Sequence, residues 1–379
     1  MAEPSGAKEG GAREAYRAAG VDVEAGERAV ALMRDAVAST RRPEVVGGFG
    51  GFAGTMEIPA GYRRPLLVAS TDGVGTKATL ARRTGRLDGL GIDLVAMCAD
   101  DVACAGAEPL FLLDYVAVGR LVPAEVATIV AGVAAGCRLA GCALLGGETA
   151  EHPGVMRPDD LDLAATCVGV VERDDLIDGR AVGTGDVLVG LPSSGLHSNG
   201  FSLVRRLVED AGLDLDDPYA AVLRRHAPGV PVEEALADAP LADALLVPTR
   251  IYARTVLAIR AAVRAAGDGL DVHGIAHVTG GGLPGNVPRI VPEGLAVRFD
   301  PGRWAMPSVM RLMGALGGLD DVELRATFNG GLGMVLAVPR GAAVEAALAT
   351  AAEEGMPGVV VGEVVPVAAT GGKRYVEAG

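Results

Sequence analysis

Apolar stretches of strand length alternate with stretches of helical periodicity along most of the chain. The strand-like runs cover residues 65–71, 109–119, 142–147, 163–172, 186–192, 333–339 and 358–365. Apolar positions recur at helical spacing in residues 93–109, in residues 123–141, which start at Pro123, and in residues 199–212, with Ser198 or Asn199 as the expected cap. The two kinds of element alternate irregularly, which predicts an α/β or α+β fold.

A polar, turn-rich segment, residues 172–186, lies between two of the strand-like runs, and we predict the domain boundary there. It divides the chain into residues 1–174 and 175–379, which is enough length for two domains. Residues 213–243 are expected to form an irregular surface insertion with short helices. The first 15 residues are polar and contain glycine, which is typical of a disordered tail and not of a targeting peptide.

Composition narrows the possible functions. Half of the 379 residues are hydrophobic but only 3% are aromatic, so alanine, valine and leucine must fill the core. The formal net charge of −14 argues against a nucleic-acid partner, because binding to a phosphate backbone needs clustered Lys and Arg, but it allows a small phosphorylated ligand.

Residues 128–147 have the length of a membrane span, yet Arg138 interrupts them and alanine and glycine dominate. We therefore expect no membrane segment and a soluble, cytoplasmic protein. The five cysteines form no C-x-x-C pair and are expected to be small buried apolar residues.

Five of the eight residues from Gly47 to Gly54 are glycine, with Phe49 and Phe52 between them. The dinucleotide fingerprint G-x-G-x-x-A matches here, but the sequence that follows carries Pro59 and cannot open the long helix that such a site needs. A P-loop motif is absent. One interpretation is a flap whose glycine N–H groups approach phosphate while the rings cover a bound base. The alternative is a plain surface loop.

Three acidic side chains stand at the ends of apolar elements. Asp72 ends an apolar strand, Asp101 lies at the edge of the buried face of a helix, and Glu148 ends a third apolar run. Lys77 follows Asp72 in a glycine-rich turn. Each acid alone is most simply a helix cap or a salt-bridge partner. Together with Lys77 and the glycine-rich loop, they favour a site for Mg²⁺ and a nucleotide, because Mg²⁺ prefers oxygen ligands and substrate phosphates.

A second loop, "GLPSSGLHSNG", opens a helix and is rich in small polar residues. Ser193, Ser194, Ser198 and Asn199 offer hydroxyl and amide donors near the helix N-terminus, where the helix dipole favours anions. His197 in this loop could bind phosphate or transfer a proton near neutral pH. The simpler alternative for a single loop histidine is a surface residue.

These stretches, taken in order along the chain, resemble the family of aminoimidazole ribonucleotide synthetases, also called phosphoribosylformylglycinamidine cyclo-ligases. The resemblance is carried by "TRRPEVVGGFGGFAG", "TDGVGTK", "GIDLVAMC", "GAEPLFLLDYVAVG", "GGETAEHPG", "SSGLHSNGFSLVR", "PTRIY" and "IAHVTGGGLPGN". Only the N-terminal tail, residues 213–243 and the C-terminus lie outside it.

The resemblance implies a two-domain fold of the kind called PurM-like. The N-terminal domain would contribute strands to a β-barrel shared across a homodimer, and the C-terminal domain would be an α/β sandwich. It also implies ATP-dependent ring closure of formylglycinamidine ribonucleotide to 5-aminoimidazole ribonucleotide, with release of ADP and phosphate, in purine biosynthesis. ATP and Mg²⁺ would be the cofactors.

The same resemblance assigns roles to the candidate residues. ATP would be bound by Gly47, Gly48, Phe49, Gly50, Gly51, Phe52, Asp72, Lys77, Asp101 and Glu148. The metal ligands would be Asp72, Asp101 and Glu148. The ribonucleotide would be bound by Ser193, Ser194, Gly195, His197, Ser198 and Asn199. The catalytic set would be Asp72, Lys77, Asp101 and His197.

Among the departures from the family's pattern, one concerns the proposed metal site, and related enzymes are the alternatives. Asp100 stands where the family usually has Asn, which adds a carboxylate beside Asp101. Selenophosphate synthetases need a reactive cysteine early in the chain, whereas here the first is Cys98. Thiamine-monophosphate kinases are expected to lack the glycine-rich flap. A non-catalytic nucleotide-binding relative remains the alternative from another class.

Overall fold

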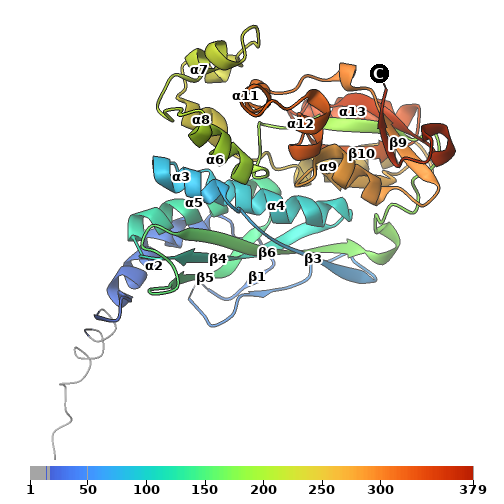
Figure 1. The fold of residues 1–379 in the computed structure, drawn as a ribbon. Helices are drawn as coiled ribbons and strands as arrows, with labels where there is room; N and C mark the ends of the chain where they lie inside the picture. The colour runs from blue at the N-terminus through green and yellow to red at the C-terminus, as the bar shows by residue number, and fades with distance from the viewer. Residues whose placement is uncertain (1–13, 15–17, 49, 379) are drawn as a thin grey trace, which may run out of the picture.

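The structure is a computed structural model that describes residues 14, 18–48 and 50–378. Figure 1 shows two layered halves stacked on each other, with helices of the N-terminal half between its own sheet and the C-terminal half. The N-terminal sheet has the strand order β3-β6-β4-β5. These strands are β3 (Pro65–Gly73), β4 (Glu108–Val118), β5 (Ala143–Glu151) and β6 (Leu161–Glu172). Strands β3, β4 and β5 run in one direction and β6 runs in the opposite one.

One face of this sheet is covered by helices, which are α2 (Val23–Ala38), α3 (Lys77–Thr84), α4 (Leu90–Cys104) and α5 (Pro123–Ala140). Helix α4 ends at Cys104 and β4 begins four residues later, so the helix predicted over residues 93–109 is shifted towards the N-terminus. Glycines allow α4 and α5 to pack closely, since a Cβ atom at Gly91 would lie 2.0 Å from the backbone nitrogen of Val133. Helix α5 is long and apolar enough to cross a membrane, but half of it is buried and it packs against α2 and α4. It is therefore a core helix.

The opposite face of the same sheet carries no described helix, as Figure 1 shows. Leu67, Leu113 and Tyr115 project from it and are exposed. Strands β1 (Val45–Val46) and β2 (Thr55–Met56) form a separate antiparallel hairpin. The N-terminal sheet thus has one covered face and one open, partly apolar face.

The C-terminal half contains a six-stranded sheet of order β12-β9-β11-β7-β10-β8. Its strands are β7 (Val187–Pro192), β8 (Gly274–His277), β9 (Leu295–Phe299), β10 (Leu332–Val338), β11 (Val359–Pro366) and β12 (Tyr375–Glu377). Its helices are α6 (Phe201–Asp210), α7 (Tyr219–His226), α8 (Leu241–Leu246), α9 (Ala253–Ala265), α10 (Gly282–Asn286), α11 (Ser308–Gly317), α12 (Asp321–Thr327) and α13 (Ala342–Glu353). Helices and strands alternate irregularly, so the predicted mixed α/β class is confirmed.

Two sequence predictions are corrected here. Residues 213–243 do contain short helices, but Tyr219 and Leu241 are completely buried, so the segment is part of the core and not a surface insertion. The N-terminal cap of α6 is Gly200, with φ of 79°, and neither Ser198 nor Asn199 caps it. The expectation for the cysteines holds, since all five are free thiols, four of them buried and Cys104 half-buried.

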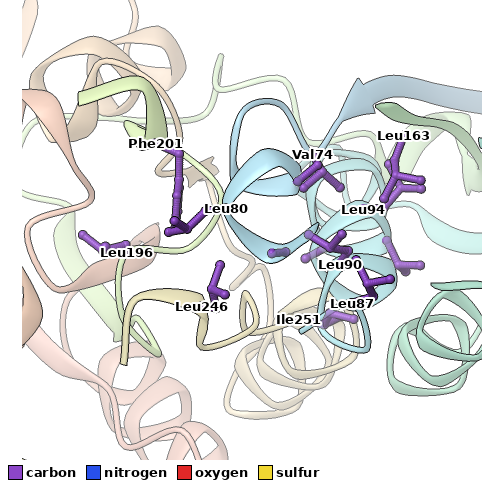
Figure 2. Close-up of a cluster of buried hydrophobic side chains, with 14 of the residues drawn as sticks. Val74, Leu80, Leu87, Leu90, Leu94, Leu163, Leu196, Phe201, Leu246 and Ile251 are labelled. Carbon is purple, nitrogen blue, oxygen red and sulfur yellow. The ribbon is translucent and has the colours of Figure 1, made fainter. Parts of the chain in front are cut away.

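The largest cluster of buried hydrophobic side chains spans both halves of the chain. Figure 2 shows Leu196, Phe201 and Leu246 of the C-terminal half in the same cluster as Leu80 and Leu90 of the N-terminal half. Burial of apolar area contributes roughly 25 cal/mol per Å². Helices α3 and α4 of the N-terminal half therefore share one continuous core with α6 and α8 of the C-terminal half. This shared core fixes the positions of the loops between the two halves.

Candidate functional site

A cleft of about 430 Å³ lies where the two halves meet. Strand β3 contributes Ser70 and helix α4 contributes Asp101, while the C-terminal half contributes His277 from β8 and Arg289. Residues more than 170 positions apart in the sequence thus share one concave surface. We define these as the cleft residues.

Asp101 is the fixed carboxylate of the cleft. One of its oxygens, Oδ2, accepts a hydrogen bond from the hydroxyl of Ser70 at 3.2 Å, and Oδ1 lies 2.9 Å from Nδ1 of His277. Burial works to raise the pKa of Asp101, but the hydrogen bond and charge of His277 outweigh it and lower this pKa below its ordinary value. The side chain is 43% exposed, so the carboxylate still faces the cleft.

His277 is almost completely enclosed, with its side chain 3% exposed. Burial works to lower the pKa of His277, whereas the bond to Asp101 and the nearby Asp100 raise it above its ordinary value. Its other ring nitrogen, Nε2, has no hydrogen-bond partner among the described residues. The sequence alone assigns no role to this histidine.

Asp72 ends β3 on the helix-covered side of the sheet, and its Oδ1 accepts a hydrogen bond from the backbone N–H of Gly73 at 2.7 Å. It is half-buried, and its charge acts on His277 and on Cys98 of helix α4. Asp72 and Asp101 therefore lie in one electrostatic environment. Their oxygens are the ligand type that Mg²⁺ prefers.

Glu148 does not join them within one chain. It stands opposite Tyr115 in the register of β4 and β5, which places it on the open face of the sheet, and β6 and β4 separate its strand from that of Asp72. No group of three His, Cys, Asp or Glu side chains able to hold a metal ion occurs in the part of the chain that the structure describes. The predicted convergence of three acids is thus limited to Asp72 and Asp101 in a single chain.

Asp100 points away from the cleft into the C-terminal half. Its Oδ1 accepts hydrogen bonds from the backbone N–H groups of Tyr252 and Ala253, both at 2.8 Å, at the start of α9. Burial raises the pKa of Asp100 to about 7. The extra carboxylate noted in the sequence therefore acts as a buried helix cap.

The environment of Lys77 differs from the phosphate site expected of it. The side chain is 1% exposed, and Nζ donates hydrogen bonds to Oδ1 of Asp93 at 2.8 Å and to the carbonyl oxygens of His197 and Val247, both at 2.9 Å. The three ammonium protons are thereby used within the protein. In this structure Lys77 does not face a phosphate-binding space.

His197 also lies in an unexpected environment. Its backbone has φ of 62°, the only positive φ of a non-glycine residue in the described part of the chain. The ring is 1% exposed, and its Nε2 accepts the backbone N–H of Ser194 at 3.1 Å. Burial lowers the pKa of His197 well below its ordinary value, so the ring is neutral at pH 7. In this structure the ring is therefore neither a cation at pH 7 nor a surface side chain.

Several other residues of the second loop form hydrogen bonds within the protein. The hydroxyl of Ser194 donates to the carbonyl of Pro248 at 2.7 Å, and that of Ser198 to the carbonyl of Val74 at 3.0 Å. Gly195 is held through its carbonyl, which accepts from the side chain of Asn329 at 2.8 Å. The buried hydroxyl oxygen of Ser193 has no partner among the described residues. The side chain of Asn199 lies next to Gly280, since a Cβ atom there would lie 3.6 Å from its Oδ1. The Ser193 oxygen is thus enclosed by the protein, whereas Asn199 is half-buried and can be reached by a ligand.

The glycine-rich stretch forms the loop of the β1–β2 hairpin. Gly47 and Gly50 have φ of 90° and 95°, and open space surrounds the Cβ positions of Gly47, Gly48 and Gly50. Phe52 is fully exposed. Phe49, predicted to cover a base, lies outside the described residues. At the base of the hairpin, Gly54 packs against Leu145 of β5, because a Cβ there would lie 2.4 Å from the Leu145 side chain. The hairpin is therefore anchored at β5.

A second cavity, of about 250 Å³, lies between α2, α5 and β5 and was missed by sequence reasoning. Its wall is mainly apolar, with Met33 and Leu144 among the lining residues, but it contains the buried carboxyl of Asp114. Burial raises the pKa of Asp114 to about 7. Gly147 leaves room for this carboxyl, since a Cβ there would lie 1.7 Å from Oδ1. The sequence signal was one aspartate inside the apolar run of residues 109–119.

Comparison with known proteins places these features in a family. Two family models match, "AIR synthase related protein, N-terminal domain" over residues 54–171 and "AIR synthase related protein, C-terminal domain" over residues 183–373. A protein of Gloeobacter violaceus named phosphoribosylformylglycinamidine cyclo-ligase is 52% identical over 353 residues, which are 93% of this chain and 98% of that protein. A protein of the same name from Geobacillus kaustophilus is 48% identical over 353 residues, 93% of this chain and 95% of its own.

Solved structures of lower identity support the fold alone. Thiamine-monophosphate kinase from Stenotrophomonas maltophilia has a TM-score of 0.62 at 17% identity, covering 92% of this chain and 96% of its own. The hydrogenase maturation protein HypE in complex with ATP also has a TM-score of 0.62, at 20% identity, covering 93% of this chain and 90% of its own. The predicted two-domain fold of the PurM-like kind is confirmed.

Proposed function

The chain belongs to the AIR synthase family, and from this premise we propose that it closes the imidazole ring of 5-aminoimidazole ribonucleotide from formylglycinamidine ribonucleotide, with conversion of ATP to ADP and phosphate. It is an ATP-dependent ligase of purine biosynthesis. The observation that carries this conclusion is identity of about 50% to phosphoribosylformylglycinamidine cyclo-ligases over more than nine-tenths of both chains. Likeness to kinases and maturation proteins at 17–20% identity gives no comparable support to another activity.

The reaction has two bond-making steps. The formyl oxygen of the substrate takes the γ-phosphoryl group of ATP and ADP leaves. A nitrogen of the substrate then forms a bond to the same carbon, the carbon–oxygen bond breaks, and phosphate departs while the nitrogen loses a proton. Phosphoryl transfer depends mainly on positioning and charge neutralisation, so it needs no strong protein nucleophile.

We place the phosphates at the cleft between the two halves. Asp72 and Asp101 would hold Mg²⁺, which would neutralise phosphate charge when bound. Arg289 adds a guanidinium to the same cleft, and the half-buried Asn199 of the second loop would offer its side-chain amide to the ribonucleotide. Support for this placement is the meeting of Asp101 from the N-terminal half with His277 and Arg289 from the C-terminal half.

We assign the adenine base to the cavity that holds Asp114. A neutral carboxyl group can donate a hydrogen bond to a ring nitrogen of adenine and accept one from its amino group. A pKa of about 7 keeps Asp114 neutral below that pH, and the apolar wall suits a flat base. The hairpin loop from Gly47 to Phe52 is anchored on the same strand, β5, which supports its proposed role as the nucleotide flap.

We propose that the active form is a homodimer. Within one chain the flap and Glu148 lie at the β5 edge of the sheet and Asp72 lies at the β3 edge. Closing two such sheets into a barrel would set β5 of one chain beside β3 of the other, and would bury the open face that exposes Leu67 and Tyr115. Glu148 would then approach Asp72 and Asp101 of the partner chain.

Two further proposals complete the assignment. We keep the domain boundary between residues 174 and 175, which falls in the gap between the two matching family models. We also propose that the enzyme works in the cytoplasm, because its five cysteines are free thiols, as expected for a reducing compartment.

One assay tests the proposed function. ADP release is measured with Mg²⁺ and ATP, in the presence and absence of formylglycinamidine ribonucleotide, with thiamine monophosphate and selenide as alternative acceptors. We expect ADP and phosphate in equal amounts when the ribonucleotide is the acceptor, and neither product with thiamine monophosphate or selenide. Binding of ATP without ribonucleotide-dependent ADP would instead indicate a non-catalytic nucleotide-binding protein.

A further inference from the structure

The turn after β3 and the loop before α6 are joined at three places. We name residues Asp72–Lys77 the nucleotide turn and residues Ser193–Ser202 the substrate loop. The hydroxyl of Ser198 donates to the carbonyl of Val74 at 3.0 Å, and the hydroxyls of Thr76 and Ser202 share a hydrogen bond of 3.1 Å. The third connection is made by Lys77.

Lys77 reaches from the nucleotide turn into a fully enclosed space between the two halves. Its Nζ donates to the backbone carbonyl of His197 in the substrate loop and to that of Val247. The charge is balanced by Asp93 of helix α4, which is 0% exposed. Oδ1 of Asp93 also accepts from the backbone N–H of Thr249 at 2.8 Å and from its hydroxyl at 2.6 Å. One buried ion pair therefore ties four separate segments together.

The carbonyl that Lys77 binds belongs to the strained residue of the loop. His197 has φ of 62°, a conformation that a non-glycine residue keeps only when its surroundings impose it. Here the surroundings are the ammonium of Lys77 on its carbonyl and the backbone N–H of Ser194 on its ring. The buried ring and carbonyl fix the backbone of the substrate loop on both sides of His197, and with it the position of Asn199.

We propose that Lys77 is a positioning residue, which sets the substrate loop from the nucleotide turn and so couples ATP binding to ribonucleotide binding. This inference rests on the proposed function, because it takes the two segments as the sites of the two substrates. Binding of the nucleotide at the turn settles Asp72–Lys77 in one conformation. Through Lys77, Thr76 and Val74 the substrate loop is settled in its binding conformation as well, so the second ligand binds to a loop that is already ordered.

The test is a binding cycle followed by calorimetry. The dissociation constant of formylglycinamidine ribonucleotide is measured with and without a saturating non-hydrolysable ATP analogue and Mg²⁺, and the ratio of the two constants is the coupling factor. For the wild type we expect a factor of at least about 5. In Lys77→Met/Asp93→Asn, which removes both buried charges, we expect a factor below about 2 and an analogue affinity, measured without ribonucleotide, within about threefold of wild type.

Several outcomes would overturn the proposal. A coupling factor in the double variant equal to that of the wild type would do so, as would a wild-type factor of 1. An analogue affinity that drops by tenfold or more without ribonucleotide would make Lys77 a phosphate ligand instead. Failure of the wild type to bind the ribonucleotide at all would contradict the proposed function, which separates the two failures.

Two further variants test whether the coupling factor depends on the contacts between the nucleotide turn and the substrate loop. Lys373→Met changes the other described lysine, which is exposed in the C-terminal turn, and should leave the coupling factor unchanged. If the double variant does not fold, Thr76→Val/Ser202→Ala removes one of the other connections. A coupling factor lowered by at least about twofold in that variant supports the proposal. An unchanged factor there overturns it.

Discussion

At the cleft between the two halves Asp101 is fixed by hydrogen bonds from Ser70 and His277, whereas at the β5 edge the glycine-rich hairpin loop exposes Phe52 and leaves open space around Gly47 and Gly50. In the cleft, protein side chains hold the carboxylate in place. The β5 edge can be completed only by the nucleotide and, in our proposal, by a second chain. The contrast suggests that phosphoryl chemistry relies on the rigid region and that nucleotide entry relies on the open one.

The largest effect should come from Asp72, whose charge acts on His277 in the cleft. In Asp72→Asn we expect kcat to fall by on the order of 10²–10³, because a charged group that would hold the metal at the transferring phosphate is lost. Steady-state ADP release measures it. Asp210→Asn, which alters an exposed carboxylate on α6, should keep kcat near the wild-type value. Wild-type turnover of Asp72→Asn at saturating Mg²⁺ would remove Asp72 from the metal site.

Near β5, the buried carboxyl group of Asp114 should make the free energy of unfolding depend on pH. The pKa of Asp114 in the folded state is about 7, against about 4 in an unfolded chain. The stability contributed by its neutral form is therefore complete below about pH 4 and is lost as the pH rises through 7. The difference in free energy of unfolding between Asp114→Asn and wild type should therefore shift in favour of the variant by on the order of 2 kcal/mol from pH 5 to pH 8. Urea unfolding at both pH values checks this, and parallel pH profiles would contradict it.

The same acid should set the pH dependence of ATP binding. Ionised Asp114 can accept a hydrogen bond from the adenine amino group but cannot donate one to the ring nitrogen, so KM for ATP should rise roughly tenfold from pH 6 to pH 8.5. Asp114→Asn keeps one donor and one acceptor, and its KM for ATP should stay nearly flat over this range. A wild-type KM for ATP that is also flat would argue against adenine in this cavity.

The smallest effect is expected in the flap. Gly50 has φ of 95° and open space at its Cβ position, so Gly50→Ala adds backbone strain without a clash. We expect kcat/KM for ATP to fall roughly fivefold, with kcat/KM for the ribonucleotide at saturating ATP changing less. Gly48→Ala is the matched control, because Gly48 has equal space and no positive φ, and it should stay within about twofold. Equal effects of the two substitutions would rule out a role for the left-handed turn.

Much of the fold could be predicted from the hydrophobic pattern. The runs at residues 65–71, 186–192 and 358–365 correspond to β3, β7 and β11 within two residues at each end, and Pro123 does begin α5. Short strands were not predicted. Strand β8 has four residues and β12 has three, too few to show a period, and pairing within the sheet stabilises them.

The candidate site was less predictable, because its contacts join distant parts of the sequence. The sequence places Asp101 at the edge of the buried face of a helix, and it does lie on α4, but its partner His277 lies 176 residues away. Lys77 follows a glycine-rich turn, as a phosphate-binding lysine does, and only the fold reveals that Asp93 and two carbonyls occupy its protons. A local motif indicates which residues can do chemistry, whereas burial and partners decide which of them face the ligand.

The central claim, that the phosphates and metal meet in the cleft between the halves, is tested most directly by locating the metal. The measurement is anomalous diffraction from crystals of the enzyme grown with Mn²⁺ in place of Mg²⁺, a non-hydrolysable ATP analogue and the ribonucleotide. We predict an anomalous peak coordinated by Asp72 and Asp101 of one chain, with Glu148 of the other chain on the same ion or on the analogue. A peak held by Glu148 alone at the open face, with Asp72 and Asp101 turned away from it, would contradict the claim.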